Sequence, residues 1–404
     1  MRQFPTEILY HILGTLRGHE SDIDYHTLRQ SLQVSRDWFP IAQRFLFHHV
    51  SVSQGHSRRN VASFAEFLHA KPGLKRAVKS LRVSFYQTGL SALSVDELSK
   101  ILALLPCLHH LDLSGDALPS LPSDHSAQWS IPSLRLSILG GTWSPLGVQG
   151  LSQTLQFLLY FTNVGELCLS LPMDLYLDDF DNTLAHFPDL SGLKVTSFLL
   201  KHAIHSRLLE ICRHTHLLDT LSKLTLVIDT VATITLLSEV LSAKQCILQE
   251  LTLTFNSKKL FENRELAPQT AQESITTCLQ PALRALHTLR TFDLRSGVTS
   301  WGSFFWETTC PGLLASLPPA IAVVHLYVNT SGFPIIKLRP SRPRCRVFPL
   351  EMPELDAALG RYEKLTDVYV HVTRLEELTR ELPATLAGGK RVHCTPWLYG
   401  SGFY

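Results

Sequence analysis

The chain has 404 residues, of which 45% are hydrophobic and 18% charged, with 37 basic against 35 acidic side chains. This near balance of charge argues against a nucleic-acid-binding protein, which gathers Lys and Arg on one surface. Since no apolar run reaches the roughly 20 residues that cross a bilayer, we also expect no membrane partner. The apolar content predicts a large core, divided between domains or spread along one elongated repeat domain.

The eight cysteines are widely spaced and include no Cys-x-x-Cys pair. Secreted proteins held by disulfides are short and dense in cysteine. We therefore expect reduced, mostly buried thiols and a cytoplasmic or nuclear protein.

Three short helices are predicted in the first 50 residues. Pro5 suits the first position of a helix, and Gly18 suits its end. A polar loop leads to a second helix at 25–35, and Ser35 is placed to cap a third at 36–50. Segments this small make only a marginal core. Their surplus of large apolar side chains predicts an interaction surface or packing against the next domain.

This stretch resembles an F-box, the motif of substrate receptors in SKP–cullin–F-box ubiquitin ligases. Phe4-Pro5, Glu7 and the apolar pairs that follow match its first part, and Val34-Ser35-Arg36 with Trp38 matches its second part. Phe4 and Ser35 replace the usual Leu and Cys. The resemblance implies docking on the SKP-type adaptor, and through it on a cullin. The residues it assigns to adaptor contact are Phe4, Pro5, Ile8, Leu9, Ile12, Leu13, Leu16, Leu28, Val34 and Trp38.

Two alternatives apply to this segment. Trp38 fits an internal core position of the three-helix unit as well as a contact position. The whole segment could also form a helical cap over the open end of the repeats that follow.

A six-residue pattern then recurs ten times: an apolar residue, a second one three positions later, and a third two positions after that. Because the last two lie two residues apart, they point to one face of a strand. The matches are VKSLRV (78–83), LHHLDL (108–113), IPSLRL (131–136), VGELCL (164–169), LSGLKV (190–195), LSKLTL (221–226), LQELTL (248–253), LRTFDL (289–294), VVHLYV (323–328) and LTDVYV (365–370), with GKRVHC (389–394) as a frayed eleventh.

Helices are predicted between these strands. The segment 94–106 begins with Ser94 and Glu97, which fit a capping box, and Pro106 follows its end. In the last helix, Pro281 should cause a kink or a break. The remaining predicted helices are 151–161, 206–215, 233–244 and 270–286.

These strand and helix units resemble leucine-rich repeats, although the repeat lengths are irregular and the asparagine after the strand is present only as Asn256. The predicted fold class is α/β: a small N-terminal three-helix F-box at 1–50, then an irregular leucine-rich-repeat solenoid at 51–404. Its curved parallel sheet would carry outer helices and end in a C-terminal cap. The alternative is a mixed α/β domain of unrelated topology.

The predicted function is a non-enzymatic substrate adaptor of such a ligase, which binds a protein substrate through its repeats. The alternatives are a repeat scaffold without ligase recruitment and an enzyme whose site residues lie far apart in sequence. We find no catalytic or phosphate-binding motif and expect no cofactor and no metal. His202 and His205, the acidic run 174–181, the basic 337–346 segment and the aromatic end 395–404 fit solvated or packing roles better than binding sites.

Overall fold

The computed structural model describes residues 6–15, 24–54, 60–85, 94–115, 129–138, 148–170, 184, 187–201, 206–243, 247–256, 260, 268–297, 305–329, 353–372, 385–386 and 390–396. The chain divides into two compact units, Met1–Lys194 and Val195–Tyr404. Several predicted features lie outside the described residues: Phe4, Pro5, Leu16, His202, His205, 174–181, 337–346 and 397–404.

The first unit begins with three short helices, α1 (Thr6–Thr15), α2 (Tyr25–Ser31) and α3 (Trp38–Leu46). The carboxylate of Asp24 caps α2, accepting a hydrogen bond of 2.9 Å from the backbone N–H of Thr27. Both α2 and α3 are shorter than predicted. Helix α3 ends early because a strand begins at His49, inside the range given to the helical segment.

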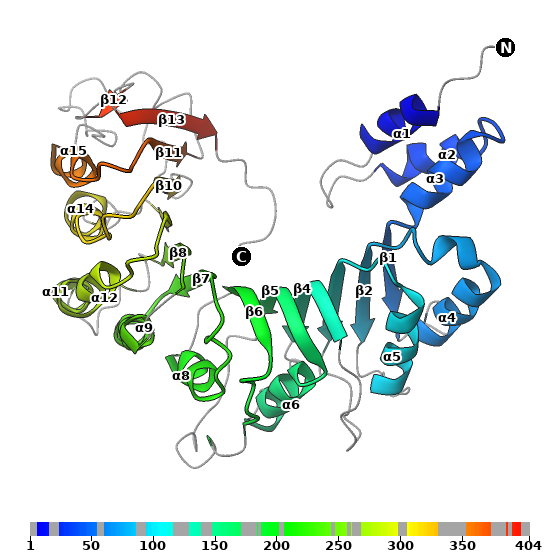
Figure 1. Ribbon diagram of the computed structural model, residues 1–404, viewed down its shortest axis with the longest axis horizontal. Coiled ribbons are helices and arrows are strands. Elements are labelled where there is room, and N and C mark those ends of the chain that lie inside the picture. Colours follow the sequence, from blue (N-terminus) through cyan, green and yellow to red (C-terminus); the bar gives the residue numbers. More distant parts are fainter. Residues whose placement is uncertain are drawn as a thin grey trace, which may run out of the picture. The chain divides into compact units, whose positions relative to one another are not determined.

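Five parallel strands follow in chain order in the first unit: β1 (His49–Ser53), β2 (Ser80–Phe85), β3 (His110–Gly115), β4 (Trp129–Ile138) and β5 (Phe161–Ser170). Between them lie α4 (Val61–Ala70), η1 (Pro72–Leu74), α5 (Val95–Leu104) and α6 (Val148–Leu158). Figure 1 shows α4, α5 and α6 on one side of these strands.

The second unit continues the pattern with β6 (Lys194–Lys201), β7 (Lys223–Ile228), β8 (Glu250–Phe255), β9 (Thr291–Gly297), β10 (Val323–Asn329), β11 (Asp367–Val372) and β13 (Lys390–Pro396). The printed pairings of these strands are parallel, and the two-residue β12 (Thr385–Leu386) pairs antiparallel with β13. The helical elements are α8 (Ser206–His214), α9 (Val231–Ala243), α11 (Pro268–Ser274), η3 (Ile275–Leu279), α12 (Gln280–Arg284), η4 (Phe305–Thr309), α14 (Cys310–Leu314) and α15 (Pro353–Gly360).

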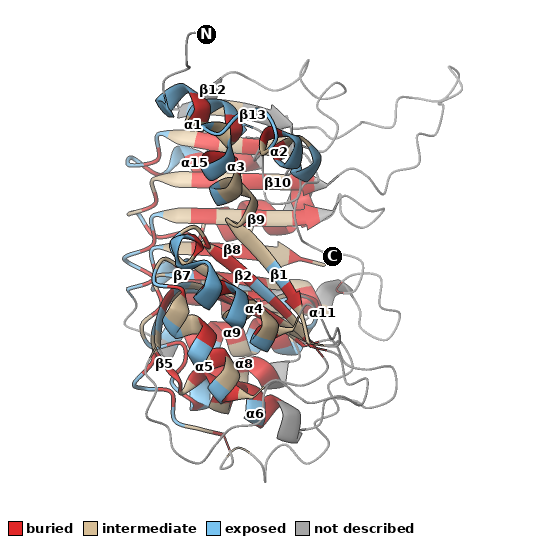
Figure 2. Ribbon diagram, turned by 90° about the vertical axis from the view of Figure 1, so that its right-hand side faces the viewer, coloured by how far each residue is buried: buried red, intermediate tan, exposed pale blue. Residues whose placement is uncertain are grey.

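The strands from β2 to β11 each bury one face. Leu81, Leu111, Leu134 and Leu167 lie side by side in one register row, and all four are fully buried. The residues between the buried positions point to the opposite face, so buried and half-buried residues alternate along β9 and β10 (Figure 2). In Figure 1 α8, α9, α14 and α15 lie on one side of β7 to β11. The predicted α/β class with a parallel sheet covered by helices is confirmed.

Two of the ten strand motifs were predicted in the wrong register. On β6, Phe198 rather than Leu193 aligns with Leu224 of β7. On β10, Val324 rather than Leu326 aligns with Phe292 of β9. Both places contain two overlapping matches to the same spacing. On β6 the strand uses VTSFLL (195–200), which comes after LSGLKV, and on β10 it uses IAVVHL (321–326), which comes before VVHLYV.

The frayed match near the end of the chain does form a strand, because Val392 of β13 aligns with Val368 of β11. Two strands were not predicted, β1 and the two-residue β12. β1 places Val50 beside Leu81 of β2, so it spans the boundary expected between residues 50 and 51.

Pro281, where a kink or a break was predicted, follows a change in the hydrogen-bonding pattern of its helix. The helical segment divides into α11, the π-helical turn η3 and then α12, with Pro281 in the first turn of α12. Proline has no N–H to donate, and its ring crowds the carbonyl one turn earlier, so a wider turn relieves the clash. The next repeat has the same arrangement of a π-helical turn before a proline, since η4 precedes Pro311 in α14.

The described cysteines are free thiols: Cys107, Cys168, Cys212, Cys278 and Cys310. Burial raises the pKa of Cys212 to about 12 and also raises the pKa of Cys310, so both remain protonated near neutral pH. Among the described helices, none has both the length and the apolar character needed to cross a membrane.

The capping box of α5 gives a test of the repeat geometry. Ser94 Oγ accepts a 3.1 Å hydrogen bond from the Glu97 N–H, and Glu97 Oε2 accepts a 3.0 Å bond from the Ser94 N–H. Replacing Ser94 with Ala should lower the free energy of unfolding by about 1 kcal/mol, as loss of a helix cap does. Ser99→Ala within the same helix is the matched control, and equal effects of the two changes in urea unfolding would contradict the assignment.

Candidate functional site

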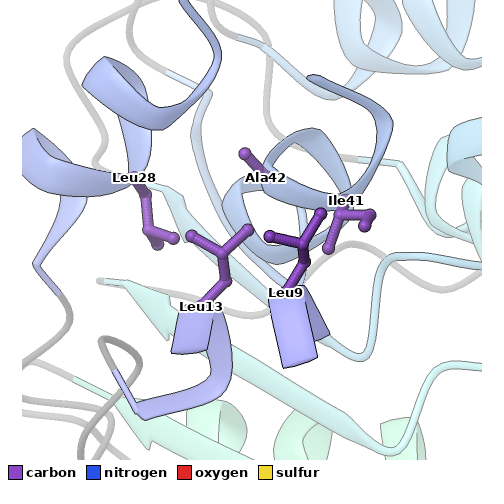
Figure 3. Close-up of a cluster of buried hydrophobic side chains, with 5 residues drawn as sticks. All are labelled: Leu9, Leu13, Leu28, Ile41 and Ala42. Atoms are coloured by element: carbon purple, nitrogen blue, oxygen red, sulfur yellow. The ribbon is translucent and has the colours of Figure 1, made fainter. Parts of the chain in front are cut away.

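The helices α1 to α3 share a small apolar core. It consists of Leu9 and Leu13 of α1, Leu28 of α2, and Ile41 and Ala42 of α3, which point toward one another in Figure 3. Partly buried side chains pack around it: Tyr10, Leu32, Trp38, Phe45 and Leu46. A hydrogen bond of 2.7 Å from Arg44 Nη1 to the Tyr10 hydroxyl also ties α3 to α1.

The structure divides the predicted adaptor-contact residues into two groups. Leu9, Leu13 and Leu28 are at most 2% exposed, so they stabilise the helical core and cannot contact a partner in this arrangement. Trp38 packs against the same core, in agreement with its internal alternative. The predicted contact residues left at the surface are Ile8 at 44% exposure, Ile12 at 37% and Val34 at 60%.

Exposed apolar side chains are concentrated in this part of the chain. Seven large hydrophobic residues are exposed among the described residues, and five of them belong to the first 46 residues. Isolated exposed leucines or valines are normal on a protein surface, whereas a local concentration indicates a contact surface. The five are Ile8, Ile12, Tyr25, Val34 and Phe39, and we call them the helical apolar surface.

A second candidate site lies in the second unit, on the face of the sheet opposite the buried leucines. Five partly exposed rings occupy this face on β10, β11 and β13: His325, Tyr327, Tyr369, His371 and His393. Because the strands are parallel and in register, His325, Tyr369 and His393 form one row, and Tyr327 and His371 form the next. We call these five side chains the ring ladder.

The rings of the ladder stack on one another across the strands. Ring centroids are 4.6 Å apart for His325 and Tyr369 and again for Tyr369 and His393, with interplanar angles of 14° and 16°. Tyr327 and His371 stack at 4.2 Å and 11°. The Arg295 guanidinium caps the second row, with its Cζ 4.4 Å from the centroid of the Tyr327 ring, which is within cation–π range.

The two rows are joined by a hydrogen bond between histidines. His325 Nδ1 and His371 Nε2 lie 3.1 Å apart, so one nitrogen must donate and the other must accept. An accepting nitrogen carries no proton, and therefore at least one of the two imidazoles is neutral. Burial lowers the pKa of both rings, that of His371 to about 4, and the charge of Arg295 acts in the same direction.

Asp293 lies beside the first row, because it is the register neighbour of His325. Its Oδ2 accepts a 3.2 Å hydrogen bond from the Thr252 hydroxyl and lies 3.7 Å from Arg295 Nη2. Its Oδ1 is buried and accepts no hydrogen bond from the described residues. Burial raises the pKa of this carboxyl, and the neighbouring His325 and Arg295 act against that shift.

The corresponding face of the first unit differs in its chemistry. Asp112 lies between two arginines of neighbouring strands, with its Oδ2 2.8 Å from Arg82 Nε and 3.9 Å from Arg135 Nη1. The next register row consists of hydroxyls, and Ser84 Oγ lies 3.0 Å from Ser114 Oγ. Two guanidinium groups share the Asp112 carboxylate in this row.

The ring ladder was not predicted from the sequence. Four of its residues occupy the places between buried positions in VVHLYV, LTDVYV and GKRVHC, and His371 directly follows LTDVYV. The signal was therefore present as Tyr and His where other repeats have Arg, Lys, Asp, Thr or Cys. In the described part of the chain, no group of three His, Cys, Asp or Glu side chains is arranged to hold a metal ion. No protein-family model matches this chain, and no curated protein is significantly similar to it in sequence.

The lowered pKa of the ladder histidines predicts a loss of stability in acid. As the pH falls from about 6.5 toward 4, the unfolded chain takes up protons at these positions before the folded chain does. The free energy of unfolding should therefore fall by about 1 kcal/mol between about pH 7 and pH 5, after allowance for partial solvent exposure.

The variant His371→Phe tests this assignment, because it keeps a ring against Tyr327 but cannot titrate. It should flatten the pH dependence of the thermal midpoint, whereas the exposed control His26→Phe should leave it unchanged. The raised pKa of Asp293 opposes the trend at lower pH but is common to all three proteins. Equal pH profiles for the His371→Phe variant and the parent chain would contradict the assignment.

Proposed function

We propose that this protein is the substrate-recognition subunit of an SKP–cullin–F-box ubiquitin ligase. In this proposal α1 to α3 dock on the SKP-type adaptor, and the repeats hold a protein substrate. The observation that carries the proposal is the helical apolar surface, which holds five of the seven large hydrophobic residues exposed in the described chain. The F-box resemblance of this segment, which includes Ile8, Ile12 and Val34, supplies the identity of the partner.

The two sets of apolar residues on α1 support docking. Leu9 and Leu13 lie one turn apart and face the helical core, while Ile8 and Ile12 form a neighbouring stripe that is exposed. The helical core covers only the stripe of Leu9 and Leu13. The stripe of Ile8 and Ile12 becomes buried only when another protein covers it. An apolar face of a partner helix in the adaptor would complete that burial.

In such a ligase this chain needs no reacting group of its own. Binding the substrate beside the enzyme that carries ubiquitin raises the local concentration of the reacting groups, and proximity supplies the rate. The sheet faces of the repeats present diverse polar and aromatic residues that could select a substrate.

A repeat scaffold without ligase recruitment is the second candidate function. In that case the ring ladder would bind a partner by itself, since it lies on strands of the second unit and involves no residue of α1 to α3. Binding to the adaptor distinguishes the two functions.

The double variant Ile8→Asp/Ile12→Asp tests adaptor docking. Both side chains are already well exposed, so the change should leave the thermal midpoint almost unchanged. It should weaken co-purification of the full chain with an SKP-type adaptor by about tenfold or more, because charges would be buried in an apolar contact.

The control is Ile247→Asp, which changes an isoleucine that is 55% exposed in the second unit and should leave adaptor binding intact. Leu13→Asp cannot distinguish a lost adaptor contact from unfolding, because Leu13 is fully buried and its replacement would unfold the helical core. Failure of the parent chain to bind the adaptor, or full binding by the double variant, would refute the proposal.

A further inference from the structure

Among the described residues, the charged groups near the ring ladder form pairs with one another. Lys223 Nζ lies 2.8 Å from Glu250 Oε2, Arg391 Nε lies 3.0 Å from Asp367 Oδ1, and Arg295 is shared between Asp293 and the Tyr327 ring. Asp367 also lies 2.7 Å from His393 Nε2. A charged segment that bound here would lose its hydration without gaining an opposite charge. The ladder is therefore complementary to an uncharged segment.

Stacking determines which part of each ring a partner can contact. The face of Tyr369 is covered on one side by His325 and on the other by His393, with centroids 4.6 Å away in both cases. The edge of the Tyr369 ring therefore remains as its accessible part. Aromatic edges carry partial positive charge, and they attract the negative face of another aromatic ring in an edge-to-face contact.

The ladder is also held in place before any partner binds. Each ring is fixed by its stacked neighbour, and the His325–His371 hydrogen bond links the two rows. Because the side chains lose little rotational freedom on binding, the cost in conformational entropy is small. Rigid tyrosine-rich surfaces with polar tips are effective protein-binding surfaces for this reason.

We propose that the ring ladder is a docking surface for an uncharged protein segment that presents an aromatic side chain. This surface acts independently of α1 to α3, so it belongs to the protein under either function proposed above. Aromatic faces of the partner pack on the ring edges, and its neutral polar groups bond to the Tyr and His tips. The first unit, with Arg82 and Arg135 around a single carboxylate, does not share this neutral character.

A peptide selection tests the proposal with defined probes. The full chain is used to select phage from a library of random dodecapeptides, and the selected peptides are synthesised and measured by fluorescence anisotropy. Peptides that bind the Ile8→Asp/Ile12→Asp variant as tightly as the parent chain are retained, so that the helical apolar surface is excluded. The retained peptides are expected to be uncharged and to contain an aromatic residue.

Three variants then locate the site. Tyr369→Ser removes the ring between two histidines and should weaken binding of these peptides by about tenfold or more. Tyr369→Phe keeps the stack and loses only the hydroxyl, so it should fold normally and weaken binding by a smaller factor of about five. Ile247→Ser, at an exposed position of the second unit outside the ladder, should change neither binding nor the thermal midpoint.

The proposal is wrong if no peptide is retained, if the retained peptides carry net charge, or if both Tyr369 variants bind them as tightly as the parent chain. None of these outcomes bears on adaptor docking, which is measured on the other unit. Conversely, loss of adaptor binding in the α1 variant leaves the peptide result unchanged.

Discussion

The architecture depends on the burial of one apolar face by every parallel strand. A strand residue such as Leu111 is fully buried, and burying a leucine stabilises the fold by about 1.5–3 kcal/mol. No single strand and helix can hide that face alone, so each repeat depends on its neighbours. Because the side chains alternate, this constraint fixes the opposite face as well: the residues between the buried positions must line up in rows across the strands. The Arg82–Asp112–Arg135 row and the ring ladder are both consequences of that register.

The two candidate surfaces differ in how they are built. The helical apolar surface exists because three short helices have too small a core to bury all their large side chains, and Ile8 and Ile12 remain outside it. The ring ladder exists because parallel strands bring Tyr and His residues within stacking distance. The first is apolar and suits a partner helix; the second is rigid, polar at its tips and neutral in charge. An adaptor with these two surfaces could hold two different partners, as the proposed function requires.

The sequence predicted most of the fold, because the spacing of buried leucines is a local signal. It predicted five helical segments between the strands, the capping box at Ser94 and an irregularity at Pro281, but not α4, α14 or α15. It could not choose between overlapping matches at 190–200 and 321–328, since both registers place apolar residues inward and only pairing with neighbouring strands decides. It also could not tell Ile8 from Leu9 as surface and core, because both fit one broad helical stripe. The ring ladder depends on contacts between residues up to 46 positions apart, which no local pattern shows.

The central claim is that α1 carries the contact surface for an SKP-type adaptor while the repeat strands remain available to another partner. Hydrogen–deuterium exchange of the full chain, measured with and without that adaptor, tests this most directly. If α1 docks on the adaptor, exchange should slow in Thr6–Thr15 when the adaptor is added, while exchange in β9 to β13 should not change. Unchanged exchange in α1, or protection confined to the repeat strands, would contradict it.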